Sequence, residues 1–308
     1  MVDLGHLKLG VLGGSPNNGH PFSFSSIINS YTVSGYNKSE WGIILDYLKN
    51  RNPVDIGING ASVTHAWTDN PSHTQILCEA SNIPNQVDEF GQMVQEVDAA
   101  MILRDDFAKH REYAKPFLDA GKPVFVDKPL ALDEIDLEYF LEYINKGQCM
   151  SCSGLRYSTK LDKLKMGDWQ IENFSLIHGL CIGGWNRYAI HLLDAIKHKF
   201  SLEVDSVLKS PLLPNTYELQ TKEDIPIMIH TNCDNQEKIE LRLFSDKNNQ
   251  TIDLNDNFDA FKRTILTFIE MLQTGKAPIP ASETAHQMKV LQAGNISRKT
   301  DEIVYVGD

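Results

Sequence analysis

The chain has 308 residues, of which 42% are hydrophobic and 23% are charged. This ordinary globular composition excludes wholesale disorder, and the length suffices for about two domains with buried cores. The formal net charge of −12 repels phosphate backbones and anionic membranes, so we expect neither nucleic acid nor a membrane as a partner.

The first half of the chain alternates short apolar runs with helical patterns. Strands are predicted at residues 7–12, 62–67, 98–103 and 123–126. The clearest helix between them follows Asp105-Asp106 and ends at Gly121. This alternation predicts an α/β fold with a doubly wound parallel sheet, of the Rossmann type. Ligands of such sheets bind at the carboxyl ends of the strands, so site residues are expected directly after each strand.

A glycine-containing loop, Gly13 to His20, follows the first predicted strand. A dinucleotide pyrophosphate would rest there on backbone N–H groups at a helix N-terminus. The spacing differs from G-x-G-x-x-G, and Pro16 has no N–H to offer. Cofactor binding and a plain strand-to-helix turn therefore both remain open.

Asp69 follows the second predicted strand, where an acid would hold the ribose hydroxyls of NAD and repel the 2′-phosphate of NADP. It lies 69 − 13 = 56 residues after Gly13, whereas the usual gap is about 20. Roughly 30 residues, near 30–60, are therefore inserted, including a predicted helix at 41–49. Asp69 as the N-cap of a helix near Ser72 fits equally well.

The most specific stretch is Ala120-Gly-Lys-Pro-Val-Phe-Val-Asp-Lys-Pro-Leu-Ala131. Lys128 ends a predicted parallel strand, so its ammonium could hold a substrate oxygen. Burial could also lower its pKa enough for proton transfer. A Lys-Pro pair in a surface turn is the alternative.

The second half has a different pattern of elements. Strands are predicted at 149–155, 170–182, 225–232 and 238–244, without an intervening helix each time. This pattern indicates an antiparallel sheet. An apolar helical stripe follows from Phe261 to Leu272 and ends at Gly275, and a closing strand is predicted at 302–306. We predict domains at 1–130 and 131–308.

Five widely spaced cysteines, without a signal-peptide pattern before them, predict a cytoplasmic protein with free thiols. Cys149 and Cys152 match C-x-x-C, but there is no second pair, and residues three apart on a strand point to opposite faces. We interpret them as core thiols and predict no metal site.

A second polar cluster is predicted where Arg187, His191 and Asp194 fall on one helix face. A histidine beside an acid can act as an acid or base near neutral pH. A salt-bridged surface stripe is the alternative.

The run 121–131 resembles the lysine signature of the Gfo/Idh/MocA oxidoreductases. The stretch 101–120 with His110 is similar to the segment that precedes it there, and His191 with Asp194 resembles the family's H-x-x-D helix. Residues 274–275 and 293–297 resemble its C-terminal helices. The similarity covers most of the chain, in the family's order.

The resemblance implies an N-terminal Rossmann domain and a C-terminal α/β domain whose open, largely antiparallel sheet forms a homodimer or homotetramer. It implies hydride transfer between a nicotinamide cofactor, NAD with NADP as the alternative, and a sugar-like hydroxyl or keto substrate. Lys128 and His191 would be catalytic. The cofactor would contact Gly13, Gly14, Asn18, Gly19, His20, Asp69, Arg104 and Lys128.

Outside the lysine run, which matches the family pattern, the sequence departs from that pattern at three places. The glycine loop is altered, Arg104-Asp105 stands where the family often has Thr-Pro, and Arg187 and Ala189 replace the usual Asp and Gly before the histidine. A cation such as Arg187 would bind a carboxylate or phosphate better than a neutral polyol, so an anionic substrate is expected. The predicted substrate-binding residues are Arg156, Trp185, Arg187, Tyr188, His191 and Asp194, with core packing as the alternative for the aromatics.

Three functions follow from these residues. The first is an NAD(P)-dependent oxidoreductase, which we predict. The second is an NAD-using lyase or hydrolase of the same family, and the third is a non-catalytic member that binds a ligand. The altered loop and Arg187 favour the third, whereas Lys128 and His191 favour an enzyme.

Overall fold

The computed structural model describes residues 5–164, 169, 174–233 and 238–307. The chain forms two compact units. The first comprises Met1–Ser151 and Phe261–Ala281, and the second comprises Cys152–Ala260 and Ser282–Asp308. Residues 131–151 and 261–281 thus lie in the first unit, whereas the predicted domains place them in the second.

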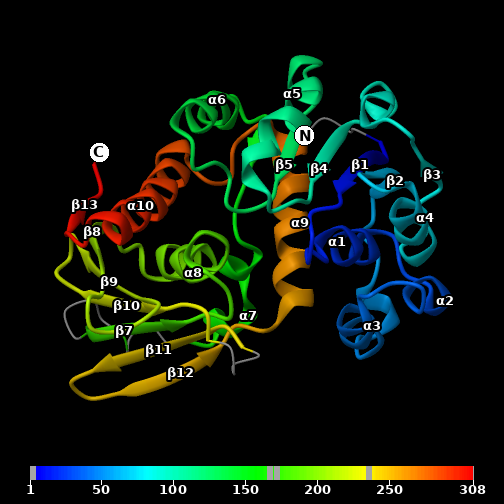
Figure 1. Cartoon of the computed structure of the whole chain (residues 1–308). Helices are drawn as coiled ribbons and strands as arrows, with labels where there is room; N and C mark the ends of the chain where they lie inside the picture. The colour runs from blue at the N-terminus through cyan, green and yellow to red at the C-terminus, as the bar shows by residue number, and fades with distance from the viewer. Residues whose placement is uncertain (1–4, 165–168, 170–173, 234–237, 308) are drawn as a thin grey trace. The chain divides into compact units, whose positions relative to one another are not determined.

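The first unit is built on a six-stranded sheet in which every pair of neighbours is parallel (Figure 1). The strand order is β3-β2-β1-β4-β5-β6, the order of the Rossmann fold. All four predicted strands are present, and the fold-class prediction is confirmed. The strands are β1 (Leu7–Gly13), β2 (Ala61–Thr68), β3 (Asn85–Gln86), β4 (Ala99–Ile102), β5 (Val124–Val126) and β6 (Cys149–Met150).

Helices connect these strands, and apolar residues of the central strands are fully buried between them. The inserted segment near 30–60 contains α2, α3 and a short 3-10 helix, Pro53–Asp55. The C-terminal part of α9 belongs here too, because Phe261 and Phe268 pack on Phe24 and Phe125. The helices are α1 (His20–Ile28), α2 (Val33–Tyr36), α3 (Gly42–Lys49), α4 (Pro71–Ala80), α5 (His110–Asp119), α6 (Glu134–Asn145) and α9 (Asn257–Thr274).

The second unit contains a seven-stranded sheet with the order β12-β11-β7-β10-β9-β8-β13. Only β7 and β10 pair in parallel among its described strands. The strands are β7 (Phe174–Leu180), β8 (Val204–Lys209), β9 (Thr216–Thr221), β10 (Pro226–His230), β11 (Glu240–Ser245), β12 (Asn249–Asp253) and β13 (Val304–Tyr305). The helices are α7 (Thr159–Asp162), α8 (Ile190–Phe200) and α10 (Ala281–Thr300).

Helix α8 packs on one face of this sheet (Figure 1). Gly179 of β7 makes that packing possible, because a Cβ there would lie 2.7 Å from a methyl group of Leu192. The opposite face carries the alternate side chains of the strands, which are partly exposed.

Sequence reasoning was wrong about one strand and missed four others. The predicted strand 149–155 stops at Met150 and joins the parallel sheet, and a 3-10 helix, Gly154–Tyr157, follows. The two-residue strand β3 was not predicted, and neither were β8, β9 and β12, because their polar positions and short apolar runs resemble loops. Residues 170–173 of the predicted strand 170–182 lie outside the described residues.

Candidate functional site

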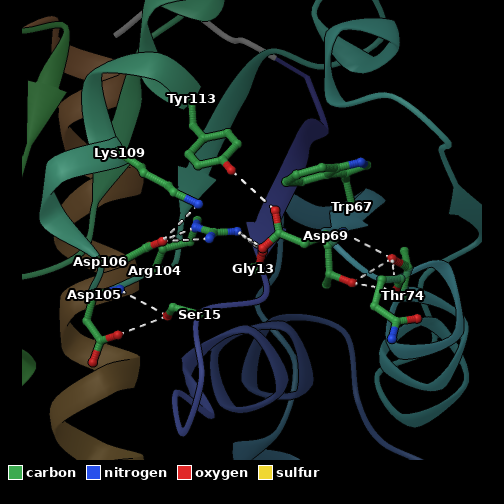
Figure 2. A network of polar contacts seen from close by, with 12 residues as sticks. Gly13, Ser15, Trp67, Asp69, Thr74, Arg104, Asp105, Asp106, Lys109 and Tyr113 are labelled. Carbon is green, nitrogen blue, oxygen red and sulfur yellow. Dashed lines mark hydrogen bonds and ion pairs between the residues drawn. The ribbon is translucent and has the colours of Figure 1, made fainter.

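Arg104 joins the carboxyl ends of three neighbouring strands of the first unit (Figure 2). Its Nη1 donates to the Gly13 carbonyl oxygen at 2.7 Å and to Asp69 Oδ2 at 2.6 Å. Its Nε and Nη2 donate to the two carboxylate oxygens of Asp106, at 2.9 and 2.7 Å. The side chain of Arg104 is only 2% exposed, so its guanidinium is buried at this edge of the sheet.

Asp69 is fixed from two sides. Arg104 contacts Oδ2, and the Tyr113 hydroxyl donates to Oδ1 at 3.3 Å. The Tyr113 ring in turn covers the guanidinium, whose central carbon lies 4.6 Å from the ring centre. The Asp69 side chain nevertheless stays 45% exposed. The capping alternative is wrong, because Asn70, not Asp69, accepts the Ser72 N–H at the start of α4.

The ion pairs of this network keep Arg104 and Asp106 charged. Burial alone would lower the pKa of Arg104, but hydrogen bonds from its guanidinium to Asp106 and Asp69 raise it above its ordinary value. Burial would raise the pKa of Asp106, but the same guanidinium lowers it. Burial raises the pKa of Tyr113 to about 12, so its hydroxyl remains a donor at neutral pH.

The glycine loop between β1 and α1 is built for close backbone packing. Gly14 has φ +110°, and a Cβ there would lie 2.8 Å from Asp69 Oδ2. A Cβ at Gly13 would lie 2.5 Å from the Pro21 ring, and one at Gly19 would meet Trp41. These positions therefore require glycine, although their spacing differs from the dinucleotide fingerprint.

Side chains of the loop are tied to the ends of β4 and β5. The Ser15 hydroxyl donates to Asp105 at 2.9 Å. The Asn18 amide donates to Asp127 Oδ2 at 3.1 Å, and His20 Nδ1 lies 2.6 Å from the same oxygen. Burial would raise the pKa of Asp127, but the neighbouring His20 and Lys128 hold it well below its ordinary value. Sequence reasoning missed Asp105 and Asp127 as anchors, although both follow predicted strands directly.

Lys128 is buried at the end of β5, as its position after a strand predicts. Its backbone N–H donates to Asp127 Oδ1 at 2.8 Å, and the peptide bond to Pro129 is cis. The buried His110 connects this segment to the Arg104 network. Its two ring nitrogens contact the carbonyl oxygens of Leu130 and Arg104, at 2.8 and 2.7 Å.

A second cluster lies within the second unit, around Ser153. The Ser153 hydroxyl lies 2.6 Å from His191 Nδ1, and its backbone N–H donates to Asp194 Oδ2 at 2.6 Å. His191 and Asp194 are thus brought together, as predicted, through Ser153, which contacts both of them. No sequence pattern indicates Ser153, because it lies 38 residues before His191 in an irregular segment.

Asp194 titrates in an unusual range for a carboxyl group. Burial raises the pKa of Asp194 to about 6, against the opposing effects of Arg156 and the Ser153 N–H. Arg156 lies 3.9 Å from Asp194 and 2.8 Å from Glu283. Because both of these carboxylates already face its guanidinium, Arg156 is not the open anion contact that the sequence predicts.

The remaining predicted substrate residues lie around the start of α8. Residues Trp185–Ala189 form a π-helical turn, so Arg187 is not in regular α-helical register with His191. Trp185 is buried, stacks on Tyr217 at 3.9 Å and donates to the Leu291 carbonyl oxygen at 2.9 Å. These contacts support the core-packing alternative for Trp185. Tyr188 packs beside His191, with ring centres 5.6 Å apart.

The residues of the first unit fit the adenosine half of a dinucleotide. An exposed, fixed carboxylate stands at the end of β2, beside a glycine whose backbone permits close approach. The start of α1 offers less to a pyrophosphate, because Pro21 has no N–H and the His20 N–H already donates to Asn18 Oδ1. Backbone donors for phosphate would have to come from the loop itself.

Other chemistry finds little support in the described part of the chain. No group of three or more His, Cys, Asp or Glu side chains there could hold a metal ion. All five cysteines are free thiols, and Cys149 and Cys152 are buried. Among the described residues, no helix combines the length and apolar character that a membrane crossing requires.

Comparison with solved structures shows the same fold over nearly the whole chain. A scyllo-inositol dehydrogenase of Lactobacillus casei has a TM-score of 0.75 at 16% identity, covering 99% of each chain. A myo-inositol 2-dehydrogenase of Lactobacillus plantarum has a TM-score of 0.76 at 14% identity, covering 98% of this chain and 100% of the other. A myo-inositol dehydrogenase of Lactobacillus casei in complex with NAD(H) and myo-inositol has a TM-score of 0.72 at 14% identity, covering 98% and 97%.

Comparison with curated proteins finds no match. A family model described as an oxidoreductase family with an NAD-binding Rossmann fold matches residues 47–154. The matched region contains Asp69, Arg104 and Lys128 and leaves out the altered glycine loop. This match confirms, over residues 47–154, the resemblance to the Gfo/Idh/MocA oxidoreductases predicted from the sequence.

Proposed function

We propose that the protein is an NAD-dependent oxidoreductase acting on a hydroxyl or keto group of a sugar-like substrate. The observation that carries this proposal is the exposed Asp69 carboxylate at the end of β2, held by Arg104 in a sheet of Rossmann order. Asp69 would accept the ribose hydroxyls of NAD, and its charge would disfavour the 2′-phosphate of NADP. Gly13, Gly14, Asn18, Gly19 and His20 would line the rest of the dinucleotide site.

When bound, NAD would supply the hydride acceptor. The catalytic residues we propose are Lys128 and His191. His191 Nδ1 contacts the Ser153 hydroxyl, so Nε2 is the nitrogen that would take the substrate's hydroxyl proton. Lys128 would hold the substrate oxygen, and its burial reduces competition from water.

The substrate class is inferred from both the site and the neighbours. The similar solved structures include dehydrogenases of scyllo- and myo-inositol, which are neutral cyclic polyols. Arg187 adds a cation four residues before His191 in the sequence. We therefore propose a cyclic polyol or its acid derivative, with Arg187, Tyr188 and Asp194 near it.

The second unit offers a surface for self-association. In the described part of this unit, one face of the sheet is partly exposed, and Leu176, Met228 and Phe244 lie there among polar residues such as Glu218 and Arg242. A mixed apolar and charged sheet face suits a second copy of the chain. We propose a homodimer or homotetramer formed through this face, in the cytoplasm, where five free thiols remain reduced.

The function is tested in two steps. NAD, NADH, NADP and NADPH are titrated at equal concentrations, following tryptophan fluorescence and the melting temperature. NADH formation is then measured with myo-inositol, scyllo-inositol and sugar acids. Saturable NAD binding and NADH formation with one of these polyols would support the proposal. Tightly retained NAD without net turnover would replace it by the lyase or hydrolase function, and no binding of any coenzyme by folded protein would favour the non-catalytic one.

A further inference from the structure

Arg104 makes four hydrogen bonds to groups from three strand ends, and each bond is directed by the planar guanidinium. The residue stands where the sequence departs from the pattern of the resembling family. A buried arginine at this place is not required to close the sheet, because the strands pair through their own backbones. One of its hydrogen bonds instead holds the exposed side chain of Asp69, while the others anchor the guanidinium to Gly13 and Asp106.

The backbone that carries Asp69 is already fixed without Arg104. The Thr68 N–H donates to the Thr74 hydroxyl at 3.0 Å, and Asn70 caps α4. What remains free is the rotation of the Asp69 carboxylate, which is 45% exposed. Arg104 on Oδ2 and Tyr113 on Oδ1 remove that freedom while leaving the outer lone pairs open.

We propose that Arg104 is a positioning and specificity-determining residue of the dinucleotide site, which holds the Asp69 carboxylate so that it accepts both ribose hydroxyls and thereby selects NAD over NADP. This inference rests on the proposed function. It adds to that function a residue that does not touch the coenzyme, since the guanidinium is 2% exposed and lies beneath Asp69.

The same geometry explains why this arginine would not recognise NADP itself. Four of its N–H groups already donate to Gly13, Asp69 and Asp106, so they are not presented to a 2′-phosphate. Asp69 and Asp106 place two carboxylates around this guanidinium, and Lys109 lies 4.0 Å from Asp106. A further phosphate would meet an occupied cation and an exposed carboxylate.

Arg104→Lys separates positioning from charge. Lysine keeps the positive charge, but its three N–H groups radiate from one atom and cannot reach Gly13, Asp69 and Asp106 together. We expect NAD to bind about tenfold more weakly, as for the loss of one charged hydrogen bond, and NADP to change by less than about threefold. The ratio of the two dissociation constants, measured by calorimetry, is therefore the diagnostic quantity.

Arg111→Lys is the matched control in the same unit. Arg111 pairs with Asp136 at 3.0 Å and lies over the Tyr139 ring at 4.5 Å, much as Arg104 pairs with Asp106 and lies under Tyr113. It belongs to α5 and takes no part in the proposed site. This variant should bind NAD and NADP like the parent protein.

A double-mutant cycle with Asp69→Asn completes the test. If Arg104 acts through Asp69, Arg104→Lys should change NAD affinity by less than about twofold once Asp69 is replaced. Asp106→Asn, which keeps Arg104 but removes its anchor, should lower the NAD to NADP preference in the same direction. It serves in place of Arg104→Lys if that variant does not fold.

Equal loss of NAD and NADP affinity in Arg104→Lys, or additive effects in the cycle, would show a merely structural arginine and overturn the inference while the proposed function stands. Absence of dinucleotide binding by the parent protein would instead overturn the proposed function, and the inference with it.

Discussion

Two buried arginines of this chain face pairs of carboxylates, and they behave differently. Arg104 in the first unit makes short, directed hydrogen bonds to Asp69 and Asp106, and the pKa of Asp106 is lowered. Arg156 in the second unit lies 3.9 Å from Asp194, and burial raises the pKa of that carboxyl to about 6. Proximity to a cation is thus not sufficient to hold the pKa of a buried carboxyl below its ordinary value, because hydrogen-bond geometry and solvent access decide.

The contrast fits two tasks. A carboxylate that remains ionised at all physiological pH values suits the fixed recognition of hydroxyl groups. A carboxyl that titrates near neutrality, beside Ser153 and His191, suits a site through which protons move. The first cluster would then bind the coenzyme, and the second would serve the chemistry.

The largest expected effect concerns stability. Arg156→Met at pH 7 leaves Asp194, which is nearly inaccessible, and Glu283 without their cation, and should cost about 3–5 kcal/mol of unfolding free energy. Arg104→Met should cost only about 1–2 kcal/mol, because Asp69 and Asp106 are partly exposed and water can replace the guanidinium. Urea unfolding of both variants checks this order, and the reverse order would break the comparison.

Catalysis should separate the two clusters next. His191→Asn should lower kcat about 100-fold or more, because a positioned general acid or base contributes at least that much. Its NAD affinity should match that of the parent protein. Steady-state kinetics with the polyol found by screening, together with NAD calorimetry, measures both. If the variant loses NAD affinity but keeps kcat, His191 serves coenzyme binding and not proton transfer.

Ser153→Ala should have a smaller effect on the same reaction. Without the hydroxyl on Nδ1, the His191 ring loses its fixed tautomer, so kcat/KM should fall about tenfold and its pH profile should shift. Ser153→Thr, which keeps a hydroxyl, should restore most of the activity and the profile. An unchanged pH profile in Ser153→Ala would mean that Ser153 only supports the backbone.

The pH dependence of stability should have opposite signs in the two units. The folded pKa of Asp194 lies above its ordinary value of 3.8, so ionisation destabilises the fold as the pH rises from about 4 to 6. Asp194→Asn should therefore gain stability relative to the parent over that range. The folded pKa of Asp127 lies below 3.8, so the loss caused by Asp127→Asn should be full near pH 7 and should shrink as the pH falls below about 4. Thermal melts across pH 3–7 test both signs.

The regularity of the first unit explains why its site was largely predictable. Parallel strands place their last residues at one edge, so Asp69, Arg104 and Lys128 follow from strand positions alone. The partners of those residues did not follow, because Arg104 reaches Gly13 across 91 positions and Asn18 reaches Asp127 across 109. Such pairings depend on tertiary packing rather than on local pattern.

The second unit was less predictable because its site is built from irregular segments. Ser153 precedes a 3-10 helix, and Arg187 lies in a π-helical turn that alters the helical phase assumed for its contact with His191. The sequence leaves Trp185 open as a binding or a core aromatic, and its burial and its stack on Tyr217 support the core interpretation. Strands such as β9, with polar outward positions, carry too weak an apolar signal.

The most direct test of the account is a calorimetric titration of NAD into the parent protein and into Asp69→Asn, side by side. The account predicts saturable binding by the parent and at least about tenfold weaker binding by the variant, since a fixed carboxylate acceptor is lost. Equal affinity in the two proteins, or no binding by the folded parent, would contradict the claim that the Arg104 network presents Asp69 to a dinucleotide.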